Sequence, residues 1–559
     1  MATADYIVLI GYLIGTFCVG LIFTRKNSTA SDMFAAGGQS PWWTSGLSAF
    51  MTMFSANTFV VWGGIAYKHG MVAVVINLMY GIAALLVGYF VAGKWKKMGI
   101  KTPAEFIQLR YGTKTLHFYT WFMMIFRMVG TAGSLYALGV VFVALLGNGV
   151  DSGLKTLSMA IIIFGGIVII YTMLGGLWAV LMTDVLQFIV LNLAVLFVIP
   201  LALMKVGGVS AFIDSAPEKF FMPVGGQYTW IFLMGWCAIH FFMIGAEWAF
   251  VQRYICVPSA KDAKKGTYLF GILYLVSPLF WLLPPMLWRI QSPIPEDATE
   301  EQIRGLAENA YILSCKAVLP PGMLGMMLAA MFSATASMVS SQLNVFSGVL
   351  TNDIYRPLKG GAISDKQMIS AGRLFTVILG IILIGIALAI PHLGGAERVI
   401  VGITELMVVA LLAPTLWGLF SRNIGSSAVW ITATVSFGAG LLVRYVFEAD
   451  STLMKTLTGV ILPLVVLLVM QLLSRKTSAG YKKVAALIAE ENTHASTGNV
   501  AASNLPALIV TWCIAILGVL MLVLTVINQE SKIVTGIFGM ILLLIATVIG
   551  WSTKIAKRT

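Results

Sequence analysis

Residues 50–64 read FMTMFSANTFVVWGG and lie inside an apolar segment that spans residues 42–66. Four of the fifteen side chains are small and polar: Thr52, Ser55, Asn57 and Thr58. An unpaired polar group is costly in hydrocarbon, so a lipid-facing helix gains nothing from such a cluster. We interpret the stretch as a broken transmembrane helix whose freed backbone groups hold an ion or a solute. The alternative is that these side chains hydrogen-bond along their own helix or to a neighbouring one.

The composition of the whole chain is that of a membrane protein. Of its 559 residues, 59% are hydrophobic and only 11% are charged, whereas charged residues make up about 25% of a soluble domain. Five cysteines are scattered without the spacing of a metal site or a disulfide framework, so we interpret them as packing residues. The sequence therefore predicts an all-α polytopic membrane protein.

Segments long enough to cross a bilayer recur along the chain. A span needs about twenty apolar residues, and fifteen segments qualify: 5–23, 42–66, 71–93, 117–147, 156–174, 179–204, 229–252, 267–288, 321–350, 370–391, 399–420, 426–446, 454–473, 505–527 and 533–552. With the N-terminus outside and the C-terminus in the cytoplasm, most lysines and arginines fall on the cytoplasmic side, as the positive-inside rule requires. The net charge of +13 is thus explained by topology, and no nucleic-acid partner is expected.

Two polar stretches lie outside these segments. The external loop 290–320 has a weakly helical, acidic pattern and is expected to form a short surface helix or lid. The internal stretch 475–503 is expected to be a linker with a short amphipathic helix around residues 481–491. Neither is long enough to form a second domain.

Ionisable residues inside the spans are candidates for function, because burying them in a membrane is costly. They are Arg127, Asp184, Glu247 and Glu405, with His240 in a span as well. The alternative is a structural role, for example a position near an interface or a pairing of Glu247 with Arg253 on the same helix face.

A second polar run occurs at residues 333–344, which read SATASMVSSQLN. Ser333, Ser337, Ser340, Ser341 and Asn344 recur at intervals of three and four residues, so they share one helix face. Several oxygen ligands suit a hard cation. We therefore expect an ion site between this helix and the broken helix around Phe54.

Four ordered motifs resemble the sodium:solute symporter family. The strongest is the run 175–180, GGLWAV, followed by Thr183-Asp184 and Gln187. The others are residues 32–43 (DMFAAGGQSPWW), 251–253 (VQR) and 352–356 (NDIYR). The family includes transporters of sugars, proline, sialic acid, monocarboxylates, choline and iodide.

The resemblance implies two five-helix inverted repeats, each with a broken first helix, among about 14–15 transmembrane helices. The first repeat is expected at residues 42–204 and the second at 229–420, joined by an external loop at 205–228. Residues 1–41 would form an N-terminal helix and a cytoplasmic lead-in. Residues 421–559 would add accessory helices around the linker 475–503.

The resemblance also implies a sodium site. Its ligands would be the backbone carbonyls of Met51, Phe54 and Ala334 and the hydroxyl of Ser337, with Asp184 on the path by which the ion leaves. At the family's second hydroxyl position this chain has Met338, and a thioether is a poor ligand for sodium. Water, Thr335 and Ser341 are the alternative sources of the missing oxygen.

The solute site implied by the resemblance is polar and differs from that of the sugar carriers. It comprises Ser55, Asn57, Thr58, Asn77, Tyr80, His240 and Tyr274. Asparagine and histidine can bond hydroxyls or carboxylates, and tyrosine can stack on a ring. The solute class stays open among sugars, carboxylates and amino-acid-like molecules, and Asn77 and Tyr80 have helix packing as their alternative role.

We therefore expect a sodium-coupled symporter of a small polar solute in a bacterial inner membrane, surrounded by lipid, and not an enzyme. The spans contain no nucleophile–base pair, HExxH motif or phosphate-binding glycine loop. The alternatives are a proton-coupled or uncoupled carrier of the same fold and a membrane solute sensor. No partner protein is indicated.

Overall fold

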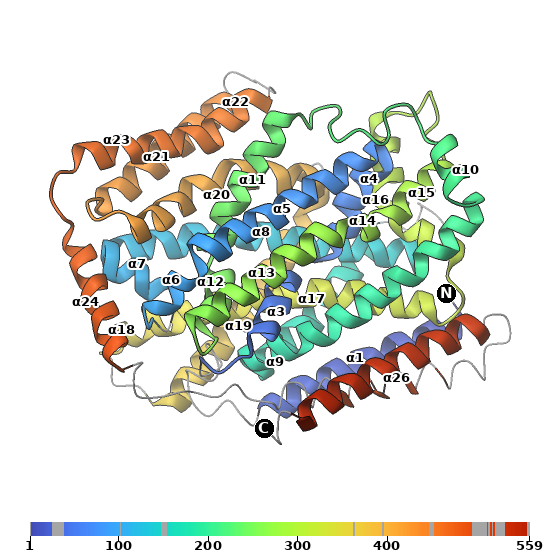
Figure 1. Cartoon of the computed structure of the whole chain (residues 1–559), viewed down its shortest axis with the longest axis horizontal. Coiled ribbons are helices and arrows are strands. Elements are labelled where there is room, and N and C mark those ends of the chain that lie inside the picture. The colour runs from blue at the N-terminus through green and yellow to red at the C-terminus, as the bar shows by residue number, and fades with distance from the viewer. Residues whose placement is uncertain are drawn as a thin grey trace.

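The computed structural model describes residues 2–24, 38–100, 102–146, 154–360, 364–393, 396–445, 452–494 and 532–555, together with seven positions between 511 and 522. The motif at residues 32–37 and most of the expected segment 505–527 lie outside this set. The described residues form helices joined by turns and short loops, and one isolated bridge joins Gly225 and Tyr228. Figure 1 shows the arrangement of the helices.

The helices of the first half of the chain are α1 (Thr3–Thr24), α3 (Trp42–Met53), η2 (Thr58–Trp62), α4 (Gly63–His69), α5 (Met71–Phe90), α6 (Ala92–Lys97), α7 (Pro103–Tyr111), α8 (Thr113–Leu146), α9 (Leu154–Val206), α10 (Val209–Asp214), α11 (Trp230–Ala246), α12 (Trp248–Ile255) and α13 (Ala260–Val276). Those of the second half are α14 (Pro278–Trp281), α15 (Leu283–Gln291), α16 (Glu300–Val318), α17 (Met323–Val349), η3 (Leu350–Tyr355), α18 (Arg356–Leu358), α19 (Asp365–Ala389), η4 (Ile390–Leu393), α20 (Ala396–Phe420), α21 (Ser426–Tyr445), α22 (Thr452–Thr456), η5 (Leu457–Ile461), α23 (Leu462–Leu473), α24 (Ala479–His494) and α26 (Lys532–Ile555).

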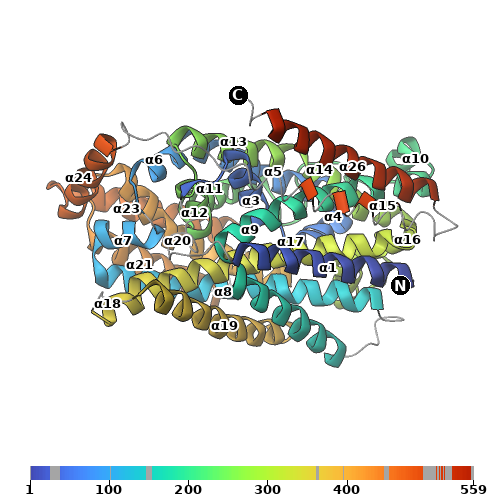
Figure 2. The same cartoon turned by 90° about the horizontal axis from the view of Figure 1, so that it is seen from below.

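The expectation of a polytopic helical membrane protein is confirmed. Within the described part of the chain, nine helices have the length and apolar character needed to cross a membrane, and the number rises to eleven if each of two bent pairs counts as one span. One expectation differs in detail: segments 156–174 and 179–204 belong to a single helix, α9, of 53 residues. Figure 2 shows that α9 bends, with one limb starting after α8 and the other leading to α10.

The segment that contains residues 50–64 is a broken helix. α3 and the η2–α4 helix meet at an angle of 61°. Between them Phe54 has an extended backbone (φ −92°, ψ 132°), and helical structure resumes as a π-helical turn at Thr58. The break leaves N–H groups without helical partners. Part of this demand is met from another helix, because the Ala56 N–H donates to Thr335 Oγ1 of α17 at 2.9 Å.

A second broken helix lies in the other half of the chain. α11 and α12 meet at 51°, and Glu247 at the break has an extended backbone (φ −68°, ψ 136°). The segment that begins near Trp230 is therefore broken like the segment that begins at Trp42. This agrees with the expectation that each half starts with a discontinuous helix.

α17 is the central helix of the molecule. Every residue of α17 except Met338 is buried, and the helix packs against α1, α3, α8, α9 and α19. A lipid-exposed helix needs no polar side chains, whereas this one carries the hydroxyl stripe predicted for residues 333–344. The stripe therefore faces other helices and not lipid.

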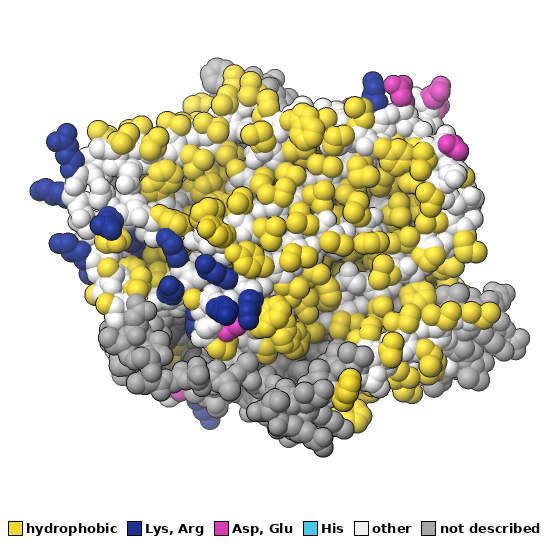
Figure 3. Space-filling view, in the orientation of Figure 1, with side chains coloured by type: hydrophobic (Ala, Val, Ile, Leu, Met, Phe, Trp, Pro, Cys, Tyr) yellow, Lys and Arg dark blue, Asp and Glu magenta, His cyan; other side chains and the backbone are white. Residues whose placement is uncertain are grey.

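The face of the molecule in Figure 3 has an apolar middle and two polar ends. Figure 3 shows apolar side chains over most of one face, with lysines and arginines gathered at the end where α6, α7 and α24 lie. Most of the acidic side chains visible on that face lie at the opposite end, near α10 and α16. The apolar middle is the surface expected to contact lipid.

Both expected extramembrane helices are present. In the loop 290–320, α16 starts with a capping box formed by Thr299 and Gln302 and packs against α4 and α15. In the linker 475–503, α24 covers the expected amphipathic region and contacts α7. Residues 495–503 of that linker lie outside the described set.

The broken helix α3 is seated by a close glycine contact. α3 packs against α13, and a Cβ atom added at Gly46 would lie 2.6 Å from the carbonyl oxygen of Gly266. The two backbones can approach this closely only because Gly46 has no side chain. The contact fixes where α3 crosses α13, and with it the place of the break.

We predict that Gly46→Ala destabilises the protein by about 1–3 kcal/mol, because the new methyl group would collide with a backbone that cannot move away. Thermal unfolding of the purified protein, followed by size-exclusion chromatography, measures the effect. Gly130→Ala in α8 is the matched control, because no atom lies within 4 Å of a Cβ at that position. Equal melting temperatures for Gly46→Ala and Gly130→Ala would contradict the role given to this contact.

Candidate functional site

Asp184 of α9 is the centre of a buried polar junction. Its carboxylate accepts hydrogen bonds from the hydroxyls of Ser48 on α3 and Ser337 on α17. Arg253 of α12 lies beside it, with Nη2 at 3.8 Å from Asp184 Oδ2. The side chains of Asp184 and Arg253 have no solvent exposure. Four helices, including one limb of each broken helix, therefore meet at one carboxylate.

Arg253 neutralises this carboxylate and ties further groups to it. Its Nε donates to Ser48 Oγ at 3.1 Å and its Nη2 to Ser341 Oγ at 2.6 Å. A buried charge is tolerated only when it is paired and hydrogen-bonded. Arg253 was part of the motif at residues 251–253 but was not among the predicted site residues. Its signal was a basic residue close to the end of an apolar run.

The pairing of Glu247 with Arg253, which was the alternative to a functional role for Glu247, is wrong. Glu247 Oε1 instead lies 3.3 Å from Nε of Arg127 on α8, and Gln342 of α17 donates to the same oxygen at 3.3 Å. Glu247 lies at the break itself, between the end of α11 and the start of α12. The second broken helix is thus fastened to α8 and α17 by its own buried ion pair.

The four groups proposed as sodium ligands lie on two helices that pack together. Met51 and Phe54 are at the end of α3, and Ala334 and Ser337 are on α17. All four residues are completely buried. The Phe54 N–H donates to the Met51 carbonyl at 3.1 Å, which caps α3. Because Ser337 also bonds Asp184, the carboxylate that is paired with Arg253 stands next to this group of oxygens.

Met338 stands where a second hydroxyl ligand was expected, and Thr335 and Ser341 were the alternative sources of that oxygen. All three side chains have other partners. Met338 accepts a hydrogen bond at its sulfur from Ser134 Oγ at 3.0 Å. Thr335 bonds the broken helix, and Ser341 accepts from Arg253. The oxygens that accompany Ser337 are therefore those of Asp184 and Ser48, and Ser48 was not among the candidates.

Three of the proposed solute residues form an aromatic cluster. The ring centroid of Tyr80 on α5 lies 3.9 Å from that of His240 on α11 and 5.4 Å from that of Tyr274 on α13. The same cluster includes Trp62 of η2 and Trp236 of α11, whose rings contact Tyr80. Tyr80, His240 and Tyr274 are at most 5% exposed, so the cluster is closed to solvent.

The remaining solute candidates lie at the break or on α5. Asn57 Nδ2 donates to Ser134 at 2.6 Å, whereas no partner for Asn57 Oδ1 occurs among the described residues. Within the break the Ser55 N–H donates to Thr58 Oγ1, and the Thr58 N–H donates to the Ser55 carbonyl. Asn77 donates to the Ala73 carbonyl of its own helix at 2.9 Å, which fits its alternative role in packing.

The aromatic neighbours of the cluster were missed by the sequence analysis. Phe50 on α3 contacts Phe54 and Tyr274, with ring centroids at 5.9 and 5.0 Å. Phe50 therefore joins the end of α3 to the aromatic cluster. Single aromatic residues are common in membrane helices, so nothing in the local sequence distinguishes these from lipid-facing ones.

Comparison with known proteins places this arrangement in a family. The family model described as the sodium:solute symporter family matches residues 33–433, which is most of the chain. The chain belongs to the sodium:solute symporter family. It is 28% identical to a sodium/sialic acid symporter of Proteus mirabilis over 67% of this chain and 76% of that protein. It is 26% identical to a sodium/glucose cotransporter of Vibrio parahaemolyticus over 79% of this chain and 85% of that protein.

The fold is shared with a solved structure. A sodium-coupled sialic acid symporter, captured in a substrate-bound outward-open state, superposes with a TM-score of 0.71 over 86% of this chain and 99% of that chain, at 24% identity. The relatives of this chain are transporters and not enzymes. This symporter family member is accordingly a multi-pass membrane protein for sodium-coupled solute symport, with sodium as the transported ion.

We predict that Arg253→Met destabilises the protein by about 3–5 kcal/mol, because it leaves the Asp184 carboxylate buried without its cation. The double variant Asp184→Asn, Arg253→Met should recover much of this loss. Thermal unfolding of the wild type, both single variants and the double variant forms a double-mutant cycle. Additive effects of the two substitutions would contradict the pairing.

Proposed function

We propose that this symporter moves a small polar organic solute together with sodium by alternating access. The observation that carries the proposal is the meeting of α3, α9, α12 and α17 at Asp184, next to the aromatic cluster on α5, α11 and α13. Both broken helices contribute to this region. An ion bound here would therefore influence the positions of the same helices that contact the solute.

Sodium would bind where the end of α3 faces α17. The carbonyls of Met51, Phe54 and Ala334 and the Ser337 hydroxyl are the proposed ligands, and hard oxygens of this kind suit sodium. Asp184 supplies a nearby negative charge that attracts the cation and lies on its exit path. Because Arg253 already bonds Ser48 beside Asp184, sodium binding and the packing of α12 are expected to influence one another.

The solute would bind between the break in the first helix and the aromatic cluster. Ser55, Asn57 and Thr58 would supply polar contacts from one side, and Asn77, Tyr80, His240 and Tyr274 from the other. A buried acceptor without a partner costs about 1–3 kcal/mol. A solute hydroxyl or N–H donating to Asn57 Oδ1 would remove that cost, which supports this placement.

The closed aromatic cluster fits an alternating-access cycle. A solute can reach these buried side chains only if helices move apart on one side of the membrane. The helices that would move are the limbs of two inverted repeats, residues 42–204 and 229–420, with residues 421–559 as accessory helices. Coupling requires that sodium bind the two states with different affinity, typically by about 1–3 kcal/mol.

The orientation proposed is N-terminus outside and C-terminus in the cytoplasm of a bacterial inner membrane. The end of the molecule that carries α6, α7 and α24 gathers basic side chains, which is typical of the cytoplasmic side. The bacterial relatives support the cellular location.

The proposal is tested by the thermal stability of the purified protein with a panel of solutes: sialic acid, glucose, proline and pyruvate. Each solute is measured in sodium and again in potassium. A solute that stabilises the protein in sodium but not in potassium supports coupled binding. Stabilisation that is equal in both salts would favour a carrier of the same fold that is uncoupled or coupled to protons.

We predict that Ser337→Ala raises the sodium dissociation constant about tenfold, the effect of losing about 1.4 kcal/mol from one ligand. Binding of radioactive sodium to the purified protein measures this directly and needs no solute. Ser347→Ala is the matched control, because Ser347 lies on the same helix and its hydroxyl bonds only the Asn344 carbonyl among the contacts described. Equal sodium affinities of the two variants would contradict the role of Ser337.

A further inference from the structure

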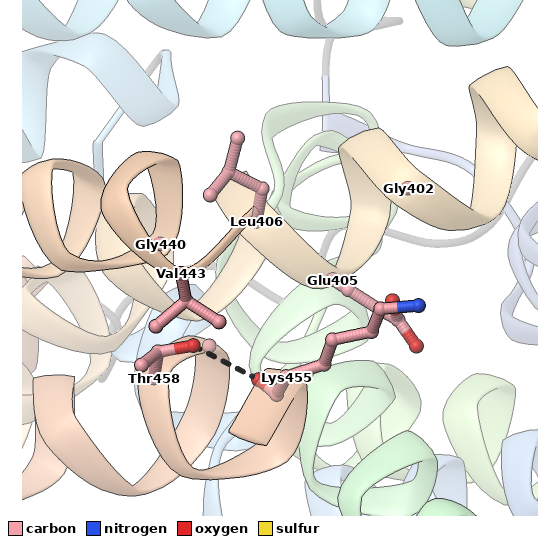
Figure 4. A pocket seen from close by; sticks show the side chains of 8 residues that line it. Gly402, Glu405, Leu406, Gly440, Val443, Lys455 and Thr458 are labelled. Atoms are coloured by element: carbon pink, nitrogen blue, oxygen red, sulfur yellow. Dashed lines mark hydrogen bonds between the residues drawn. The ribbon is translucent and has the colours of Figure 1, made fainter. Parts of the chain in front are cut away.

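A charged recess lies away from the sodium and solute region, between α20, α21 and the α22–η5 helix. It is a small recess that is partly open to the surface. Its lining residues are Gly402, Glu405, Leu406, Gly440, Val443, Lys455, Thr458 and Gly459. Figure 4 shows the side chains of Glu405 and Lys455 pointing toward one another at the edge of this recess. The other lining side chains are apolar or small, except for Thr458.

Both charged residues lie within membrane spans. Glu405 belongs to the span Val399–Phe420 and Lys455 to the span Leu453–Leu473. Ionisable residues at such positions are costly and usually serve a function. The sodium and solute residues proposed above do not include either of them, so that function is unassigned.

The frame around the recess is tightly built. A Cβ atom added at Gly459 would lie 2.4 Å from the Glu405 carbonyl oxygen, and one added at Gly440 would lie 2.3 Å from a methyl group of Leu406. Gly459 sits in the π-helical turn η5. Such turns occur frequently at functional sites because they displace the backbone from regular helix packing. The glycines hold the three helices in place and leave the recess between them.

The same two charged residues also line a second recess, which reaches α11. It is smaller than the first recess, and Trp236 and Gly235 contribute from α11. The other neighbours of Trp236 are Tyr80 and His240 of the aromatic cluster. A molecule bound beside Glu405 and Lys455 would therefore lie next to α11, the limb of the second broken helix that carries His240.

The recess borders the apolar outer surface of the protein. Leu441 and Leu442 of α21 and Leu457 of η5 flank the lining residues and are 41%, 51% and 41% exposed. Exposed leucines on membrane spans contact lipid chains. A ligand with apolar chains could thus place its polar end between Glu405 and Lys455 and its chains against these leucines.

We propose that this recess binds the polar end of a zwitterionic amphiphile, with an ammonium group donating to Glu405 and a phosphate or carboxylate group accepting from Lys455. An aminophospholipid of the surrounding membrane has this chemistry, and so does a free amino-acid-like zwitterion. Charge-assisted hydrogen bonds are stronger than neutral ones and require N–H donors on the ammonium. The site therefore distinguishes a primary ammonium from a quaternary one, which lacks N–H groups.

The probe is phosphatidylethanolamine, added to the delipidated protein and followed by native mass spectrometry. Phosphatidylcholine and phosphatidylglycerol serve as comparisons, because the first has no ammonium N–H and the second has no cation. We expect phosphatidylethanolamine to bind at least about tenfold more tightly than either, a difference within the range of one charge-assisted bond. Equal binding of the three lipids would overturn the proposal. Competition by soluble glycerophosphoethanolamine would assign the site to a free zwitterion, and no competition would assign it to a lipid.

Variants locate the effect. Glu405→Gln and Lys455→Met should each abolish the preference for phosphatidylethanolamine, whereas Glu300→Gln on the exposed start of α16 should retain it. Val443→Phe fills the recess without removing either charge and should also abolish the preference, which covers the case that the charge variants fail to fold. Survival of the preference in folded Glu405→Gln or Val443→Phe protein would overturn the proposal.

Discussion

The rest of the structure depends on the hydrogen bonds and the ion pair made by the buried carboxylate of Asp184. A charge inside a membrane protein must be paired, and Asp184 finds its partners on three other helices: Ser48 on α3, Ser337 on α17 and Arg253 on α12. α3 belongs to one broken helix and α12 to the other. Both broken helices therefore contact the same charged group, the Asp184 carboxylate. Any change in the charge at this point, such as the arrival of a cation, would act on both of them.

Much of the fold could be predicted from the sequence, because the cost of polar groups in hydrocarbon leaves a clear pattern. Ser55, Asn57 and Thr58 marked the first broken helix, and the hydroxyl stripe 333–344 marked the buried helix α17. Each inference needed only local composition and the requirement that backbone groups be satisfied. The continuity of α9 was not foreseen, since Gly175 and Gly176 have low helix propensity but belong to the helix.

The partners of the buried charges could not be predicted in the same way. A pairing of Glu247 with Arg253, six residues away, was one alternative, but Glu247 pairs with Arg127, which is distant in sequence. The aromatic cluster combines Tyr80, His240 and Tyr274 from three different helices. The recess at Glu405 on α20 is lined by Lys455, which comes from α22. Which side chains come into contact depends on how the helices cross. The pattern of a single sequence does not contain this information.

The most direct test of the account is solute uptake into liposomes that contain the purified protein. An inward sodium gradient is compared with an equal potassium gradient for sialic acid, glucose, proline and pyruvate. The account predicts accumulation of one solute class above its external concentration with sodium and only equilibration or no uptake with potassium. Accumulation that is the same with potassium, or that follows a proton gradient in the absence of sodium, would contradict it.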